Sequence, residues 1–114
     1  MIKNRAEAVV AIEDAMLNGK LKRIADLAIQ RKMPAIGLPE FADAGALLAY
    51  GVNLVQMFRH AGVFVDKLLK GAKVSELPVE RASTFETVLN LKTAKTLGIK
   101  LSDAIRLRAD RVIE

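Results

Sequence analysis

The side chains that most often carry out catalysis are nearly absent from this sequence. There is one histidine, His60, and no cysteine among the 114 residues, so thiolate zinc sites, cysteine nucleophiles and disulfides are excluded. His60 falls on the polar side of an expected helix, and no set of metal ligands surrounds it. The three serines, Ser75, Ser83 and Ser102, have no neighbouring histidine or lysine that would indicate an activated hydroxyl group. We therefore expect a protein that is not an enzyme and that holds no metal and no cofactor.

Polar and aromatic residues stand at the ends of three short apolar runs. The runs cover residues 8–12, 35–38 and 47–50, and continuous apolar runs of this length are typical of strands buried on both faces of a parallel sheet. In open sheets of this kind, ligands bind beyond the carboxyl ends of the strands. The sequence therefore predicts a ligand-binding rim made of the residues at these ends: Glu13, Asp14, Glu40, Phe41, Tyr50 and Gly51.

Four of these residues also have a structural alternative that the sequence leaves open. Glu13 and Asp14 could contact a ligand amine, or they could end a strand and cap a helix. The ring of Phe41 could line the cleft, or it could anchor the core. Tyr50 combines an apolar ring with a hydroxyl group that suits ligand binding, and structural packing is an equal alternative.

Helical patterns lie between the apolar runs. A helix capped by Asn18 is expected to end near Lys32, and a longer helix is expected to begin at Asn53 and end at Gly71. A strand follows near residues 86–91, then a short helix ending at Gly98 and a last helix from residue 102 with Val112 on its inner face. This alternation predicts an α/β fold, a three-layer Rossmann-like sandwich with a mostly parallel sheet.

Composition limits the class of protein further. The chain is 52% hydrophobic and 27% charged, which is typical of one folded domain and excludes disorder. The net charge of +5 is spread along the chain, which favours a solvated surface; nucleic-acid binding is the weaker alternative, and we expect no nucleic-acid partner. No apolar stretch reaches the roughly 20 residues of a membrane span. The first residues do not form a secretory leader, so the chain as given is expected in the cytoplasm.

Several motifs in a fixed order resemble one protein family. They are the stretch 34–51 (Pro-Ala-Ile, then Glu-Phe and Tyr-Gly), residues 65–73, Leu77-Pro78-Val79-Glu80, Asn90 to Gly98, and Ala109-Asp110-Arg111-Val112-Ile113. In this order and spacing they resemble the substrate-binding proteins of bacterial ABC transporters, in the branch related to tryptophan and tyrosine uptake. The resemblance covers residues 8–114. One departure is Ala46, which stands where the family usually has a second glycine.

The resemblance implies a fold and a function. Family members have a type I periplasmic-binding-protein-like fold, with two Rossmann-like lobes that clamp a ligand, and they work with an ABC permease outside the cytoplasm. This chain matches only the C-terminal part, so it would be part of one lobe. It would bind a small amino-acid-like or organic solute, weakly on its own, and the sequence does not identify that solute. The alternative is a truncated relic that serves only as an oligomeric structural or interaction domain.

The missing lobe leads to an expectation about assembly. We expect residues 1–114 to form a single α/β domain, in which the segment from about Phe85 onward packs on a missing lobe or on a partner chain. Apolar surface left open in this way is an association site. The sequence therefore predicts a homodimer or a larger homo-oligomer, formed through the C-terminal segments.

Overall fold

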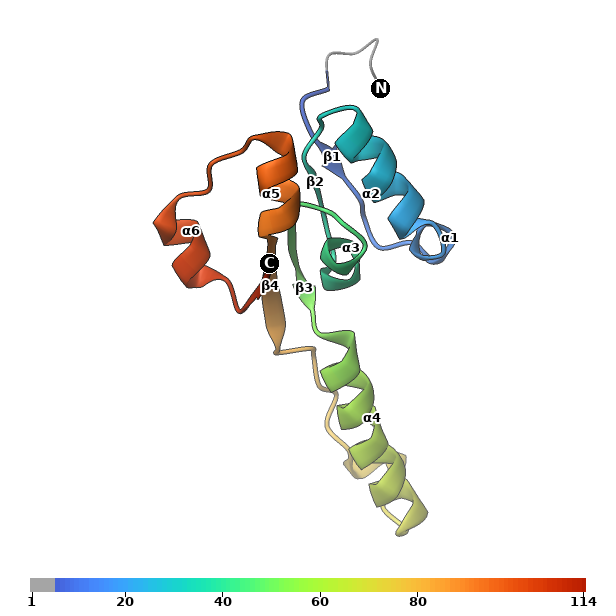
Figure 1. Cartoon of the computed structure of the whole chain (residues 1–114). Coiled ribbons are helices and arrows are strands. Elements are labelled where there is room, and N and C mark those ends of the chain that lie inside the picture. The colour runs from blue at the N-terminus through green and yellow to red at the C-terminus, as the bar shows by residue number, and fades with distance from the viewer. Residues whose placement is uncertain (1–5) are drawn as a thin grey trace. The chain divides into compact units, whose positions relative to one another are not determined.

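The computed structural model describes residues 6–114, and its helices and strands alternate along the chain (Figure 1). The strands form one five-stranded sheet in the order β1-β2-β3-β4-β5. Their bounds are β1 Val9–Val10, β2 Ala35–Gly37, β3 Leu48–Val52, β4 Phe85–Asn90 and β5 Arg111–Ile113. The helices are α1 Ala15–Asn18, α2 Leu21–Gln30, α3 Pro39–Asp43, α4 Leu54–Leu69, α5 Leu91–Leu97 and α6 Asp103–Arg108, with a short 3-10 helix, η2, at Val74–Glu76.

The chain divides into two compact units. The first, here called the sheet unit, contains the chain up to Gly51 together with Glu86–Glu114, and the second, the helix unit, is Val52–Phe85. Within the helix unit, α4 buries none of its residues. The single α/β domain expected from the sequence stays a prediction, and the division places Glu86–Glu114 in the sheet unit. Whether that segment also contacts another lobe or a partner chain stays a prediction.

Three of the four neighbouring strand pairs are parallel, which confirms the α/β fold class with a mostly parallel sheet. β1 pairs with β2, β2 with β3, and β4 with β5 in parallel. The pair β3 and β4 is the exception. The N–H of Asn90 donates to the carbonyl of Leu47, and the N–H of Asn53 donates to the carbonyl of Thr84, so the end of one strand lies beside the start of the other. These two strands therefore run in opposite directions.

Small residues form most of the core of the sheet unit. One cluster joins Ala25 and Ala28 of α2 to Ala35 of β2, and Phe41 of α3 completes it with Ala46. Because alanine side chains are short, α2 can approach the sheet closely, and the ring of Phe41 fills the space that remains. A second cluster lies further along the sheet and consists of Ala42, Ala49 and Val88, with Ile113 packed against it.

Two buried polar residues hold α5 in place. Asn90 caps this helix, because its Oδ1 accepts from the N–H of Thr93 at 3.0 Å, and its Nδ2 donates to the carbonyl of Ala42 at 3.1 Å. The hydroxyl of Thr93 donates to the carbonyl of Gly45 at 2.9 Å. Both side chains are buried with their polar atoms bonded, so they connect α5 to the end of α3 without an unpaired polar group.

The sequence-based boundaries were wrong at two places. Asn18 is the last residue of α1 and does not cap the next helix, since the cap residue of α2 is Lys20. The last helix, α6, ends at Arg108, and Val112 lies in the strand β5. Its backbone pairs with β4 at Leu89, so this segment forms its hydrogen bonds with the sheet and not within a helix.

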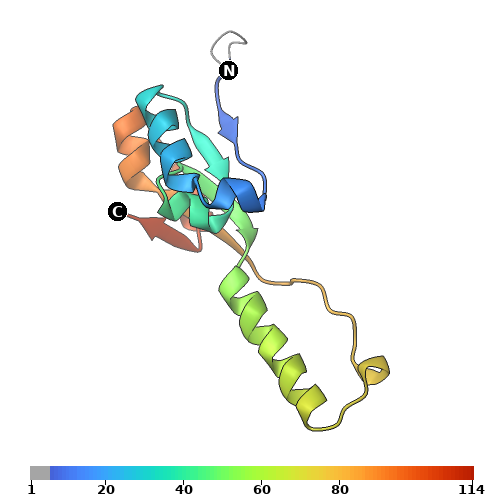
Figure 2. The ribbon, with the colours of Figure 1, turned by 90° about the vertical axis from the view of Figure 1, so that its right-hand side faces the viewer.

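The helix unit consists of α4 and the segment that returns from it (Figure 2). α4 begins where expected, because the Asn53 side chain accepts from the N–H of Gln56 at 3.0 Å, and Gly71 follows its end with φ +97°. Apolar side chains on this helix are exposed, with Phe58 among them. No described helix has both the length and the apolar character needed to cross a membrane.

Candidate functional site

The carboxyl ends of β1, β2 and β3 meet at one edge of the sheet unit. The N–H of Ala11, just after β1, donates to the carbonyl of Ile36 in β2 at 2.8 Å. Ile36 in turn lies opposite Leu48 in β3. A Cβ placed on Gly37 would lie 3.1 Å from the carbonyl oxygen of Ala11, so the ends of β1 and β2 are in close contact. The rim predicted from topology lies at these three strand ends, and its role in ligand binding stays a prediction.

The end of β3 contacts the junction between β2 and α3. A Cβ placed on Gly51 would lie 2.5 Å from Cδ2 of Leu38 and 3.2 Å from Cδ of Pro39. Glu40 follows Pro39, and Tyr50 precedes Gly51, so both residues belong to this edge of the sheet unit. Gly51 itself is buried under the junction, where a larger residue would separate the two strand ends.

Three of the predicted rim residues have exposed side chains at this edge. Glu13 lies in the loop after β1, Glu40 lies in the first turn of α3, and both are exposed. Tyr50 is 61% exposed, although it lies within a strand. These three side chains provide two carboxylates and one phenol ring with a hydroxyl group. Such a set can accept hydrogen bonds from an ammonium group and can stack against a ring.

Two predicted site residues have structural roles here. Oδ1 of Asp14 accepts from the N–H groups of Met16 at 2.8 Å and Leu17 at 3.2 Å, so Asp14 is the N-cap of α1. Phe41 is 1% exposed and belongs to the core. Both are the structural alternatives that the sequence left open. The ring of Phe41 packs against the end of β2, because its Cδ1 would lie 2.6 Å from a Cβ placed on Gly37.

The side chain of Arg111 connects β5 to α3 and to β4. Its guanidinium donates to both carboxylate oxygens of Asp43 in α3, at 2.6 and 3.0 Å, and to Oε1 of Glu86 in β4 at 2.9 Å. The hydrogen bond to Asp43 and then that to Glu86 raise the pKa of Arg111 above its already high value. The side chain stays charged at any ordinary pH, so its role is to fix α3 against β4 and β5.

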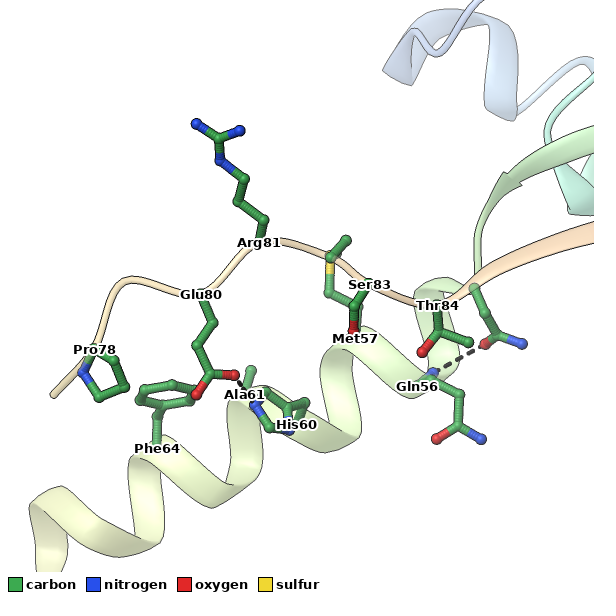
Figure 3. Close-up of a pocket in the computed structure, with 12 residues that line it drawn as sticks. Gln56, Met57, His60, Ala61, Phe64, Pro78, Glu80, Arg81, Ser83 and Thr84 are labelled. Carbon is green, nitrogen blue, oxygen red and sulfur yellow. Dashed lines mark hydrogen bonds and ion pairs between the residues drawn. The ribbon is translucent and has the colours of Figure 1, made fainter.

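The helix unit contains a hollow that the sequence analysis did not find. Its volume is about 490 Å³, and it lies between α4 and the segment that follows η2 (Figure 3). Nε2 of His60 pairs with Oε2 of Glu80 across it, and the ring of Phe64 contacts that of His60 edge-on, with centroids 5.4 Å apart. Residues 73–83 show no helical or strand periodicity in the sequence, so they gave no signal for this hollow. In that segment, only Pro78 indicates an extended backbone.

No group of three metal-binding side chains occurs among residues 6–114. The rim carboxylates of Glu13 and Asp14 have no histidine beside them, and His60 is in the helix unit with one carboxylate partner. The expectation that no metal is held stays a prediction.

Comparison with known proteins identifies the family. The profile of the family described as ABC transporter substrate binding protein matches residues 1–113. A search of curated proteins gives no significant match. The fold is similar to a conserved domain protein from Vibrio cholerae O1 biovar El Tor, with TM-score 0.87, 24% identity, and coverage of 97% of this chain and 38% of that chain.

Two further solved structures have the same fold. An ABC domain from Streptococcus pneumoniae in complex with L-Trp has TM-score 0.87 and 23% identity, and the match covers 98% of this chain and 38% of that chain. A ligand-free, open substrate-binding protein with adhesive properties from Clostridium difficile has TM-score 0.63 and 20% identity, with coverage of 94% and 36%. This chain therefore spans less than two fifths of the length of these structural relatives. Because the family profile covers nearly all of it, the chain belongs to the ABC transporter substrate-binding protein family.

Proposed function

We propose that this chain supplies one wall of a binding site for a small amino-acid-like or organic solute that an ABC importer takes up. The observation that carries this proposal is the rim, where Glu40 and Tyr50 are exposed at adjoining strand ends. Glu13 is exposed after β1, at the same edge. The solute-binding character of the family supports this function.

The chemistry of the rim favours a cationic group and an apolar body on the solute. The chain has a net charge of +5, yet Glu13 follows β1 and Glu40 follows β2, and both carboxylates are exposed. Carboxylates of this kind attract an ammonium group, while the exposed ring of Tyr50 provides an apolar surface beside them. Gly51 keeps the strand ends close together. A related structure holds L-Trp, which has both an ammonium group and a ring.

A single wall binds a solute weakly. Ligand pockets bury most of the ligand surface, and a rim that covers one side leaves the other side in water. Losing about 4 kcal/mol of contacts changes a micromolar dissociation constant to a millimolar one. We therefore propose millimolar affinity for this chain alone. The structural relatives are more than twice its length, and a second wall would be found in such additional chain.

The partners follow from the same function. An ABC permease would receive the solute outside the cytoplasm, as is usual for the family. Self-association into a homo-oligomer is a separate proposal, supported by the apolar side chains that remain exposed on the described chain, such as Phe58 and Leu107. A relic that binds no solute is the competing function, and the experiment below distinguishes the two.

The test is a titration of the ¹⁵N-labelled chain with L-tryptophan, L-tyrosine and L-leucine to millimolar concentration. We expect NMR shift changes at the amides of Glu40, Tyr50 and Gly51, and weaker binding in the variants Glu40→Gln and Tyr50→Phe. The matched control Glu7→Gln changes an exposed carboxylate away from the strand ends and should bind as the parent does. If no solute moves the rim amides, the binding function is wrong and the relic remains.

A further inference from the structure

A small hollow lies between α5 and α6 in the sheet unit (Figure 1). Its volume is about 210 Å³. Gly98 shapes it, because this residue ends α5 with φ +70° and allows the N–H of Ile99 to donate back to the carbonyl of Ala94 at 2.9 Å. The chain therefore turns back along α5 before α6 begins. The residues that line the hollow are Leu91, Ala94, Lys95, Ile99, Leu101 and Arg106.

The lining combines apolar surface with positive charge. Ala94 is buried, and the three other apolar residues of the hollow are half-buried. Lys95 of α5 and Arg106 of α6 are exposed. Of the described residues that line the hollow, none is acidic. An apolar wall beside two cations fits a ligand that has a negative charge at one end and a hydrocarbon body at the other.

The two cations have no partner within the described chain. Neither Lys95 nor Arg106 forms a side-chain hydrogen bond or an ion pair with another residue of the range 6–114. Arg111, by comparison, donates to two carboxylates. The sequence around the hollow is also basic, because residues 91–108 contain five lysines and arginines and one acidic residue, Asp103. Both cations are therefore free to donate to an anion in the hollow, with charge-assisted hydrogen bonds.

The size of the hollow limits the ligand to a small molecule. A water molecule occupies about 30 Å³ of liquid, so the hollow has room for about seven of them. A short carboxylate with a body of about five carbons has a similar size. Inorganic phosphate would use the two charges and leave the apolar wall in water, whereas each methylene that this wall covers strengthens binding by up to about fourfold.

We propose that the hollow between α5 and α6 binds a short-chain monocarboxylate. The guanidinium of Arg106 and the ammonium group of Lys95 hold the carboxylate, and the hydrocarbon body lies against Ala94 and Ile99. Arginine suits this role, because the fork of its N–H groups matches the two oxygens of a carboxylate. The ligand would contact two helices that otherwise share little, since α6 buries none of its residues.

This site is distinct from the rim. Asn90, directly before α5, donates through its N–H to the carbonyl of Leu47, just before the start of β3. The rim residues Tyr50 and Gly51 lie toward the other end of that strand. The two sites share no residue, so the proposal goes beyond the solute-binding function above and does not depend on it.

The experiment is an NMR titration of the ¹⁵N-labelled chain with sodium acetate, butyrate and hexanoate at constant pH and ionic strength. We expect saturable shifts at the amides of Lys95, Ile99 and Arg106, and a dissociation constant that falls by about tenfold or more from acetate to hexanoate. Hydrogen exchange of the α6 amides should slow when hexanoate is bound. Inorganic phosphate, titrated in the same way, should bind more weakly than hexanoate.

Matched variants separate this site from general attraction by the basic surface. Arg106→Gln should weaken hexanoate binding by about tenfold. Arg108→Gln should bind as the parent does, because Arg108 is an exposed arginine of the same helix that does not line the hollow. Slow exchange at Val88 and Leu89, both buried, confirms that each variant is folded.

Three outcomes overturn the proposal. The first is the absence of a saturable shift with hexanoate, and the second is equal affinity for phosphate and hexanoate, since the apolar wall would then have no role. The third is an equal loss of binding in Arg106→Gln and Arg108→Gln, which would show attraction by net charge alone. Failure of the rim to bind L-tryptophan leaves this result unaffected, because it is read from the amides of different residues.

Discussion

Both terminal nitrogens of Arg111 on β5 donate to the two carboxylate oxygens of Asp43 on α3, although 68 residues separate the two in sequence. The same guanidinium donates to Glu86 on β4. This planar side chain with its forked donors thus joins a strand at the edge of the sheet to the helix that follows β2. It is one reason why the short strand β5, with only three residues, has a defined place.

Replacing this arginine by lysine tests the contribution of that geometry. Arg111→Lys keeps the charge but loses the paired hydrogen bonds to Asp43, and we expect the free energy of unfolding to fall by about 1 kcal/mol. The effect stays small because the side chain is 40% exposed. Urea denaturation at low and high salt measures it, with Arg108→Lys on the exposed end of α6 as the control. An Arg111→Lys protein as stable as the parent would contradict this role.

Replacing the buried Asn90 should lower the free energy of unfolding more than replacing an exposed asparagine. Asn90→Ala removes the cap of α5 and the bond to the carbonyl of Ala42, leaving buried polar groups unpaired, so we expect a loss of about 2–3 kcal/mol. Chemical denaturation gives this value, and Asn18→Ala at the exposed end of α1 should cost much less. Equal losses in the two variants would show that the network is not important.

A methyl group at Gly37 should disturb the rim through the core. The new Cβ would lie 2.6 Å from Cδ1 of Phe41 and 3.1 Å from the backbone oxygen of Ala11. Because that ring is fully packed and the oxygen belongs to the backbone, we expect Gly37→Ala to destabilise the protein by about 1–3 kcal/mol. Gly19→Ala, with no atom within 4 Å and a negative φ, is the matched control and should be neutral or slightly stabilising. Thermal unfolding of the two variants decides the matter.

Ala46 occupies the position where the family usually has a second glycine, and here its methyl group is fully buried beside Phe41. Restoring glycine by Ala46→Gly removes this contact and adds backbone freedom next to Gly45, which already has φ +118°. We expect a loss of about 1 kcal/mol. Equilibrium unfolding in urea checks the value against Ala82→Gly, which changes an exposed residue. A more stable Ala46→Gly protein would show that alanine strains the turn.

Apolar runs placed the first three strands because a strand buried on both faces needs little beyond continuous apolar residues, and a strand was also expected near residues 86–91, where β4 lies. β5 was not predicted as a strand, because it begins with the charged residue Arg111 and because its pairing with β4 depends on side chains far away in sequence. Helix α4 was placed well because its two ends have local signals, Asn53 and Gly71. Periodicity shows which residues of this helix share a face and says nothing about what covers that face.

The candidate site could be predicted in outline but not in detail. Topology alone located the strand ends, and Glu40 and Tyr50 are indeed exposed there. Sequence could not tell that Phe41 turns into the core, because an aromatic residue one position after an exposed glutamate fits either environment. Nor could it assign Asp14, since a helix cap and a ligand contact require the same short carboxylate. These choices depend on packing between segments that are distant in sequence.

The segment Val52–Phe85 connects two neighbouring antiparallel strands, β3 and β4. At the point where they meet, the N–H of Asn53 donates to the carbonyl of Thr84. This segment could be removed, because a tight hairpin turn could join the end of β3 directly to the start of β4. Each halving of the closed length would save about 0.6 kcal/mol of chain entropy. A shortened, hairpin-bridged polypeptide would then retain the rim while lacking α4, and it would offer a minimal scaffold for grafting other solute-recognising surfaces.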